Sequence, residues 1–205
     1  MMTLIEKATI VHYHRHRMEE YEGGTVEALG YRNLKSQTRR FEALTAAFDL
    51  NGSTVLDVGC GHGDLKGFLD RRFHDFCYVG IDQMAEFVVQ ARTCYGQRPE
   101  CYFCIADFTA AEMPRAEYVF ASGLLGYRCA DSGFYFDMIE KLYAAADKAL
   151  AFNMLDGRVF PDHPLLVGHD PAVVEEYCRR LAPQVSVVQG YLEDDFTILM
   201  HKVDQ

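Results

Sequence analysis

The sequence predicts an α/β fold: a doubly wound, Rossmann-like, mostly parallel sheet that a C-terminal antiparallel hairpin closes, with an N-terminal helical cap before it. Three observations predict it. From residue 53 onward, short apolar runs alternate with stretches of helical periodicity. A glycine-rich loop follows the first run. The last two runs are joined only by residues 190–195, which is too short for a parallel crossover, so they must pair antiparallel.

Residues 1–52 differ from the rest, and we expect them to form a helical cap or lid rather than an independent domain. Within them, residues 33–48 carry an apolar stripe at helical spacing, formed by Phe41, Leu44 and Phe48. Asn33 or Ser36 can cap this helix at its start. Asn51 and Gly52 then form a turn that ends it.

Strands and helices alternate through the middle of the chain. The predicted strands cover residues 54–58, 77–81, 100–106, 117–122 and 148–155, and the predicted helices cover residues 63–72, 83–95, 134–146 and 171–181. The first strand, residues 54–58, is a short, β-rich apolar run closed by glycine, as is typical of a buried parallel strand. Residues 185–189 and 196–202 are the two strands of the closing hairpin.

Composition bounds the function classes. The chain has 205 residues, 49% hydrophobic, which suits one domain with a sizeable core. Its net charge of −10 works against nucleic acid as a partner and favours a small molecule. No apolar run spans a bilayer, and residues 1–17 do not resemble a signal peptide, so we expect a cytoplasmic protein without a membrane partner.

The seven cysteines predict reduced, buried thiols rather than a disulfide framework or a metal site. Their number is odd, and most fall inside predicted strands and helices. Cys101 and Cys104 form the only close pair, within a predicted strand, and a lone pair lacks the second half of a zinc site. We therefore predict no metal.

The glycine loop Gly59-Cys60-Gly61-His62-Gly63 joins the first strand to the first helix, where nucleotide ligands bind in such folds. It is not the dinucleotide fingerprint, because Asp64 stands where that motif requires glycine. It is not a phosphate-binding P-loop, because no Gly-Lys-Ser/Thr follows. Asp57 ends the preceding strand, and its carboxylate would repel a pyrophosphate but suits an ammonium group. A cationic adenosine derivative without phosphate fits best: S-adenosylmethionine.

Side chains at the ends of the next two strands support this ligand. Asp82 can accept both ribose hydroxyls, a feature that NAD would also use. Asp107 and Phe108 can contact the adenine amino group and ring, with Met84 on the other side. Asp57 and Asp82 could each be an ordinary turn or cap residue, and Met84 a core residue. The predicted cofactor-binding residues are Asp57, Gly59, Cys60, Gly61, Asp82, Gln83, Met84, Asp107, Phe108 and Ser122.

Residues 55–63 (VLDVGCGHG) resemble the first motif of class I S-adenosylmethionine-dependent methyltransferases, of the small bacterial type. Residues 78–82 (YVGID), 106–107 (AD) and 117–123 (EYVFASG) resemble the second, third and fourth motifs. The resemblance covers residues 53–203 and implies that residues 53–205 form the cofactor-binding domain. It implies that Asp57, Gly59 and Gly61 hold the methionine end, Asp82 the ribose and Asp107 the adenine.

One departure from the family narrows the acceptor. Enzymes that methylate exocyclic amines of bases usually carry Asn/Asp-Pro-Pro-Tyr/Phe after the fourth strand. Here the sequence is Ser122-Gly123-Leu124-Leu125. That difference puts a DNA or RNA amine in doubt, in agreement with the net charge.

No catalytic residue is evident from the sequence. Alternating His12, His14 and His16 favour a solvated segment, although Tyr13 or His14 could close over the site as part of a lid. Tyr31, Lys35, Gln37 and Arg40 are candidate contacts near the mouth of the cofactor site. The Tyr31-x-x-x-Lys35 spacing matches the catalytic pair of short-chain dehydrogenases. In those enzymes, however, the pair follows the glycine loop, whereas here it precedes the loop. His163, with Asp156 and His169, follows the fifth strand and could supply a base.

We expect an enzyme that transfers a methyl group to a small-molecule acceptor by in-line displacement. Only a hydroxyl or a protonated amine would require a base. Alternatives are a protein or RNA methyltransferase, a non-catalytic S-adenosylmethionine-binding module, and an NAD-dependent oxidoreductase, which Asp57 and Asp64 disfavour. The sequence does not indicate the identity of the acceptor, its reacting atom, the pathway or the oligomeric state.

Overall fold

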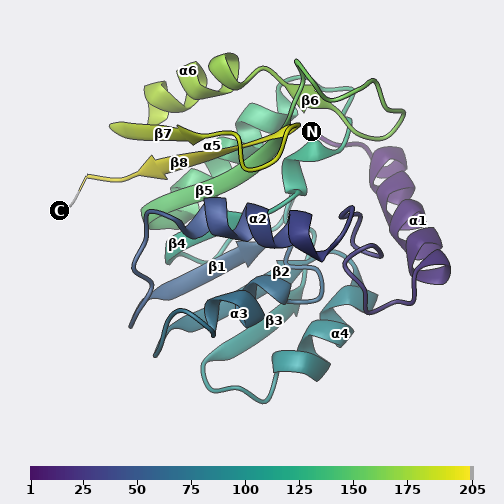
Figure 1. The fold of residues 1–205 in the computed structure, drawn as a ribbon, viewed down its shortest axis with the longest axis vertical. Coiled ribbons are helices and arrows are strands. Elements are labelled where there is room, and N and C mark those ends of the chain that lie inside the picture. Colours follow the sequence, from purple (N-terminus) through teal and green to yellow (C-terminus); the bar gives the residue numbers. More distant parts are fainter. Residues whose placement is uncertain (204–205) are drawn as a thin grey trace.

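The computed structural model describes residues 1–203, which fold around one mixed β-sheet (Figure 1). The sheet has the order β3-β2-β1-β4-β5-β8-β7, and a short β6 pairs with β5. The strands are β1 (Thr54–Val58), β2 (Cys77–Asp82), β3 (Cys101–Ile105), β4 (Ala116–Ala121), β5 (Ala146–Asp156), β6 (Gly168–His169), β7 (Gln184–Val188) and β8 (Asp195–His201).

The pairing directions confirm the predicted doubly wound sheet with a closing hairpin. β1 pairs in parallel with both β2 and β4, and parallel pairing continues from β2 to β3 and from β4 to β5. β8 runs antiparallel to its neighbours β5 and β7. The strand order reverses between β1 and β4, and ligands of such sheets bind beyond the carboxyl ends of the strands at that point.

Helices cover both faces of the sheet. They are α1 (Leu4–Glu20), α2 (Leu34–Thr45), α3 (Asp64–Leu69), α4 (Ala85–Tyr95), α5 (Phe134–Ala145) and α6 (Pro171–Leu181). Buried side chains of α2, α3 and α4 form one apolar cluster with one face of the sheet, and those of α5 and α6 form a second cluster with the other face. The two clusters bury the strands on both sides, as parallel strands require.

The helix α1 was not predicted, and it lies beside the sheet rather than on either face (Figure 1). Among its residues only Ile10 and His14 are buried, so it has no wide apolar stripe for periodicity to detect. A capping box between Thr3 and Glu6 does mark its start. That Thr-x-x-Glu pattern was the available sequence signal.

The predicted helix in residues 33–48 is shorter than expected, because α2 ends at Thr45. Both expected cap residues act together: Asn33 accepts a hydrogen bond from the Ser36 backbone N–H, and the Ser36 hydroxyl accepts one from the Asn33 N–H. Phe41 and Leu44 are buried, as the stripe predicted, and Phe48 is buried just beyond the helix.

The expectation of buried thiols is wrong for four of the seven cysteines. Cys60, Cys101 and Cys178 are buried, whereas Cys94 and Cys104 are exposed and Cys77 and Cys129 are partly buried. Alternation explains the difference within β3, where neighbouring side chains point to opposite faces of an edge strand. Within residues 1–203, no helix has the length and apolar character needed to cross a membrane.

Candidate functional site

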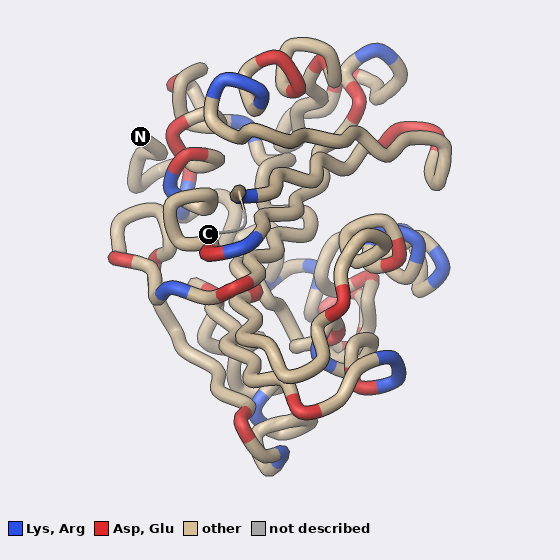
Figure 2. The backbone as a smooth tube through the Cα atoms, turned by 90° about the vertical axis from the view of Figure 1, so that its left-hand side faces the viewer, with Lys and Arg blue, Asp and Glu red and all other residues tan. Residues whose placement is uncertain are grey.

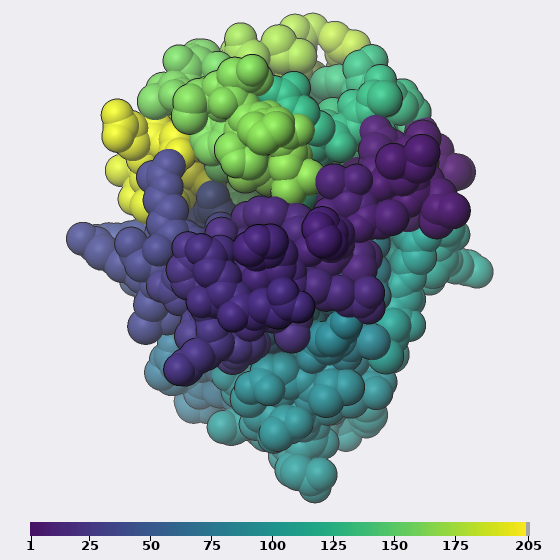
Figure 3. All heavy atoms as spheres, turned by 90° about the vertical axis from the view of Figure 1, so that its right-hand side faces the viewer, coloured from purple at the N-terminus to yellow at the C-terminus, as the bar shows by residue number. Residues whose placement is uncertain are grey.

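A pocket opens at the carboxyl ends of β1, β2, β4 and β5, and the N-terminal segment forms its roof. Strand ends contribute Asp57, Asp82 and Asn153 to the lining. Tyr13 and His14 of α1 and residues 29–31 line it from the other side. Figure 3 shows the same arrangement from outside, with the N-terminal segment in purple spread over one face of the molecule.

The glycine loop lies directly beneath this roof. Gly59 and Gly61 have φ angles of 77° and 54°, which L-residues rarely adopt. The N–H groups of Gly59 and Cys60 both donate to the carbonyl of Ile81, at 2.7 and 3.1 Å, and so join the loop to the end of β2. A Cβ atom on Gly61 would lie 2.8 Å from Cδ2 of Leu29. The positive φ and the close approach of Leu29 both favour glycine at position 61.

Asp82 is held in one orientation at the pocket wall. Its Oδ2 accepts from the Gly61 N–H at 2.9 Å, and its Oδ1 accepts from the Met84 N–H at 2.8 Å. The residue is 7% exposed, and this burial raises the pKa of its carboxyl to about 6, although the backbone amides oppose the rise. A carboxylate fixed in this way presents a defined acceptor surface to a ligand.

Asp57 is the second buried carboxyl of the lining, at 2% exposure. Burial raises its pKa to about 7; the hydrogen bond from Tyr78 opposes the rise, and the charges of Asp82 and Asp64 add to it. The Tyr78 hydroxyl donates to Asp57 Oδ2 at 2.5 Å. Two buried carboxyls in one pocket give it a negative potential, which favours a cationic ligand group.

The other predicted cofactor-binding residues are divided. Cys60 and Gln83 line the pocket, as do Met84 and Phe108, which were expected to contact the adenine, and Thr109 joins them. Asp107 does not line it. Its carboxylate accepts instead from Lys7 Nζ of α1 at 2.7 Å and from the Thr109 hydroxyl at 2.6 Å. No pattern in the sequence indicated that α1 would bring a lysine to this strand end.

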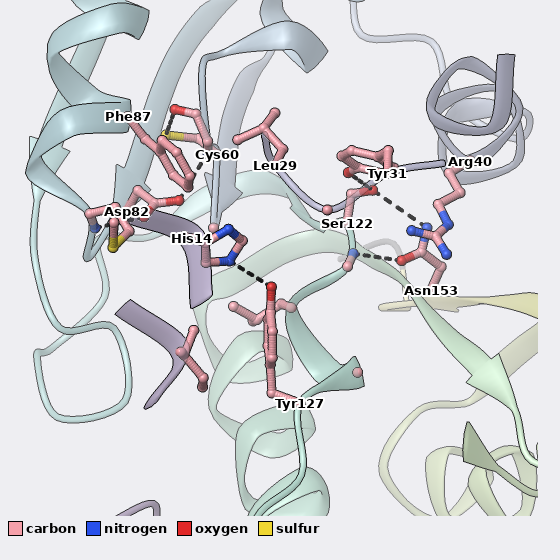
Figure 4. Close-up of a pocket in the computed structure, with 18 of the residues that line it drawn as sticks. His14, Leu29, Tyr31, Arg40, Cys60, Asp82, Phe87, Ser122, Tyr127 and Asn153 are labelled. Carbon is pink, nitrogen blue, oxygen red and sulfur yellow. Dashed lines mark hydrogen bonds between the residues drawn. The ribbon is translucent and has the colours of Figure 1, made fainter. Parts of the chain in front are cut away.

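The opposite end of the pocket is polar (Figure 4). The Tyr31 hydroxyl and the Ser122 hydroxyl lie 3.0 Å apart, and Arg40 lies over the Tyr31 ring, 5.3 Å from its centre. Asn153 Oδ1 accepts from the Gly123 N–H at 2.7 Å. Ser122 and Tyr31 were predicted site residues, and the structure brings them together here.

Arg40 forms the central ion pair of this end. Its Nη2 lies 2.5 Å from Oδ2 of Asp195, whose side chain is 1% exposed. The Tyr191 hydroxyl also donates to Asp195. The Nε of Arg40 is buried and has no hydrogen-bond partner. Asp195 was not among the predicted site residues, although its position immediately before the last predicted strand was visible in the sequence.

Of the catalytic candidates, Tyr13, His14 and Tyr31 line the pocket and His163 does not. The ring of His163 is used locally, because its Nδ1 accepts from the backbone N–H groups of Leu165 and Leu166. His14 is 6% exposed, so the interpretation of its segment as solvated is wrong at this position. His12 and His16, on the outer face of the helix, are exposed.

Three further candidates from the sequence lie outside the pocket lining. Lys35 is exposed on α2, whereas Gln37 and Arg40 of the same helix line the pocket. Asp156 is paired with Arg158. The ring of His169 packs on Tyr135, 4.3 Å between centres. Tyr127, which does line the pocket and lies 2.6 Å from His14, was missed, because nothing local distinguishes it from a core tyrosine.

Comparisons with known proteins agree with this geometry. The methyltransferase-domain family profile matches residues 55–145. A Mycobacterium tuberculosis protein described as "putative methyltransferase Rv1506c" is 32% identical over 164 residues, which is 73% of this chain and 93% of the relative.

Solved structures share the fold. The complex of DhpI with S-adenosylhomocysteine has a TM-score of 0.68 at 17% identity and covers 95% of this chain and 96% of its own. Magnesium protoporphyrin IX methyltransferase from Synechocystis PCC 6803, with bound S-adenosylhomocysteine, has a TM-score of 0.64 at 16% identity and covers 82% and 83%.

Proposed function

Because the chain belongs to the class I S-adenosylmethionine-dependent methyltransferases, we propose that its acceptor is a small molecule, enclosed with the cofactor beneath the N-terminal roof. The observation that carries this proposal is the roof itself, in which Tyr13, His14 and residues 29–31 line the pocket opposite the strand ends. On this proposal residues 1–52 serve as the cap of a cofactor-binding domain that begins at residue 53. When bound, the cofactor would supply a methyl group on a sulfonium sulfur; an acceptor nucleophile would attack the methyl carbon in line, and the neutral thioether would leave.

The pocket residues fit that cofactor. The carboxyl of Asp57 suits its cationic methionine end, and the fixed carboxylate of Asp82 suits the ribose hydroxyls. Met84 and Phe108 offer apolar surfaces for the adenine. Arg40 is the only lysine or arginine among the lining residues described, and its unpaired Nε can donate to the methionine carboxylate.

In this proposal Asp107 does not make the direct contact with the adenine that the sequence had led us to expect. Its carboxylate lies outside the lining and is occupied by Lys7 and Thr109. We therefore assign the direct adenine contacts to Met84, Phe108 and Thr109. Asp107 then fastens α1 beside the adenine end through Lys7.

Three observations support a small acceptor. Leu29 lies on the glycine loop, and Tyr13 and His14 line the pocket from α1, so a nucleotide of tRNA or a protein side chain would have to displace this roof. Lys and Arg are scattered among Asp and Glu along the backbone rather than gathered in one long stretch (Figure 2). Magnesium protoporphyrin IX methyltransferase, which shares the fold, is named for a small acceptor.

The test follows the methyl label. The purified protein is incubated with methyl-labelled S-adenosylmethionine and one of three fractions from the same cells: small molecules, tRNA, or protein. We expect label in the small-molecule fraction, and none with Asp82→Ala. Asp147→Ala, at an exposed residue that pairs with Arg115, serves as the matched control. Label confined to tRNA or protein would contradict the proposal.

A further inference from the structure

His14 and Tyr127 meet inside the pocket although they are 113 residues apart in the chain. Nε2 of His14 lies 2.6 Å from the Tyr127 hydroxyl oxygen, and both residues line the pocket (Figure 4). His14 comes from α1 and Tyr127 follows the short 3-10 helix η1 (Leu124–Gly126) after β4. The pair therefore joins the roof to the segment that follows β4 at the carboxyl edge of the sheet.

Neighbouring groups hold both side chains in place. The ring of His14 packs edge-on against Tyr13 and Phe87, with centres 5.2 and 5.1 Å apart. The backbone of Tyr127 is fixed by a bridge to Leu166, and its carbonyl accepts from the Tyr135 hydroxyl at 2.9 Å. A pre-positioned pair of this kind loses little freedom when it acts on a ligand.

The second ring nitrogen indicates the direction of the hydrogen bond. Nδ1 of His14 lies 3.5 Å from the carbonyl oxygen of Ala28. Because a carbonyl can only accept, this contact favours a proton on Nδ1, which leaves Nε2 with a lone pair. The Tyr127 hydroxyl then donates to Nε2, and its own oxygen keeps lone pairs for another donor.

The electrostatic surroundings keep the imidazole neutral. Burial lowers the pKa of His14, the Ala28 carbonyl opposes that fall, and the charges of Arg17 and His62 add to it, so that the pKa is about 4. Burial raises the pKa of Tyr127, and Tyr13, Asp82 and Tyr31 add to that rise while Arg17 opposes it. At neutral pH the pair is therefore a phenol hydrogen-bonded to a neutral imidazole.

We propose that Tyr127 accepts the proton of a hydroxyl acceptor and passes its own phenolic proton to Nε2 of His14 during methyl transfer. This inference rests on the proposed function and narrows its acceptor to a group that must release a proton; among such groups it commits to the hydroxyl of an alcohol or a phenol. Tyr127 is the catalytic residue of the pair, and His14 is a positioning residue that acts through it.

The step balances. The acceptor oxygen forms a bond to the methyl carbon, while the carbon–sulfur bond breaks and its electron pair remains on sulfur as a neutral thioether. The acceptor O–H proton moves to the oxygen of Tyr127, and the Tyr127 proton moves to His14. The products are an ether, the thioether and an imidazolium, which returns its proton to water. Thiolates and carboxylates arrive without a proton and would leave the pair unused.

The first experiment identifies the product and the tautomer. With ¹³C-methyl-labelled cofactor and the small-molecule fraction, the chemical shift of the transferred carbon distinguishes an ether from a thioether, an amine or an ester. We expect an ether. Independently of turnover, ¹⁵N spectra of the imidazole are expected to show His14 protonated at Nδ1 and bare at Nε2. Any other product class, or a proton on Nε2, would overturn the inference.

The second experiment separates a chemical role from a structural one. Tyr127→Phe and His14→Gln are compared with Tyr143→Phe and His12→Gln, whose side chains lie outside the pocket lining. We expect each test variant to lose at least about tenfold in kcat near pH 6, with S-adenosylhomocysteine affinity unchanged. The kcat of each test variant should rise with pH, because hydroxide can remove the acceptor proton in place of the relay. The kcat of the wild-type enzyme should not change over the same pH range. A flat profile, or a loss no larger than in the controls, would refute the relay.

The two proposals fail in different ways. If the wild-type protein does not bind S-adenosylhomocysteine, or if the label is found only in tRNA or protein, the proposed function is wrong and this inference is wrong with it. Label in a small molecule on nitrogen, sulfur or a carboxylate would leave the proposed function standing and remove only the relay.

Discussion

Replacing Arg40 by methionine is expected to destabilise the protein by about 3–5 kcal/mol at pH 7, because it leaves a buried carboxylate without its opposite charge. The side chain of Asp195 is 1% exposed and that of Arg40 is 17% exposed, so neither charge is well solvated. Tyr191 still donates to Asp195 in the variant, which favours the lower end of that range. At roughly 2–4 °C per kcal/mol for a chain of this size, the lower end corresponds to a fall in Tm of about 6–12 °C.

The loss of stability caused by Arg40→Met should depend on pH. Burial already raises the pKa of Asp195, and Arg40 opposes that rise, so removing Arg40 raises the pKa further. A carboxyl whose pKa is higher in the folded than in the unfolded state binds more protons when folded, so the folded form gains stability as pH falls. The deficit of the variant is therefore largest above the folded pKa and shrinks as the pH is lowered toward the unfolded pKa.

The assay is thermal unfolding followed by circular dichroism at several pH values. Arg40→Met with Asp195→Asn removes both charges and should recover most of the stability at pH 7. Arg39→Met, on the same helix in an exposed pair with Glu42, should cost at most about 1 kcal/mol. The reasoning is refuted if Arg40→Met is as mild as Arg39→Met, or if the double variant is no more stable than the single one.

Three further predictions concern the cofactor. Asp82→Ala should abolish the stabilisation of roughly 2.7 kcal/mol that S-adenosylhomocysteine at a hundred times its Kd confers on the wild type, as measured by thermal unfolding. The affinity for S-adenosylhomocysteine, measured by calorimetry, should fall as the pH drops through about 7. In the proposed site Asp57 must be ionised to hold the ammonium group, and the pKa of its carboxyl is about 7. Asp57→Asn should bind the ligand weakly, with an affinity that does not change with pH in this range. Gly61→Ala should cost about 1–3 kcal/mol of stability from its positive φ and weaken cofactor binding, and Leu29→Ala should relieve only the steric part of the cost.

The sequence predicted the sheet because parallel strands that are buried on both faces leave a strong local signal. The helix predicted for residues 171–181 coincides with α6, where Asp170 caps the start and Pro171 occupies the first turn. The helix α1 was missed because it lies on the rim of a pocket and buries too few side chains to show a stripe. The strand β6, of two residues, exists only through its pairing with β5, which no local pattern encodes.

The same difference between local and long-range signals holds for the residues of the site. Asp57 and Asp82 were predictable because topology alone places the ends of neighbouring parallel strands together. The partners of the site were not, because they come from distant segments: Arg40 meets Asp195, His14 meets Tyr127, and Lys7 meets Asp107. The placement of His163 failed for the opposite reason, because a local turn uses its ring.

The long separation between residues that meet in the pocket has a consequence for how the molecule assembles. The contact between Tyr31 and Ser122 spans 91 residues, and that between His14 and Tyr127 spans 113. Such contacts must close long loops before they contribute any stability, so they form late in folding. A partly folded chain that holds only its glycine loop and first strands lacks both the roof and β8, whose Asp195 lines the pocket. Recovery of cofactor binding during refolding thus marks completion of the whole sheet, not of its first half.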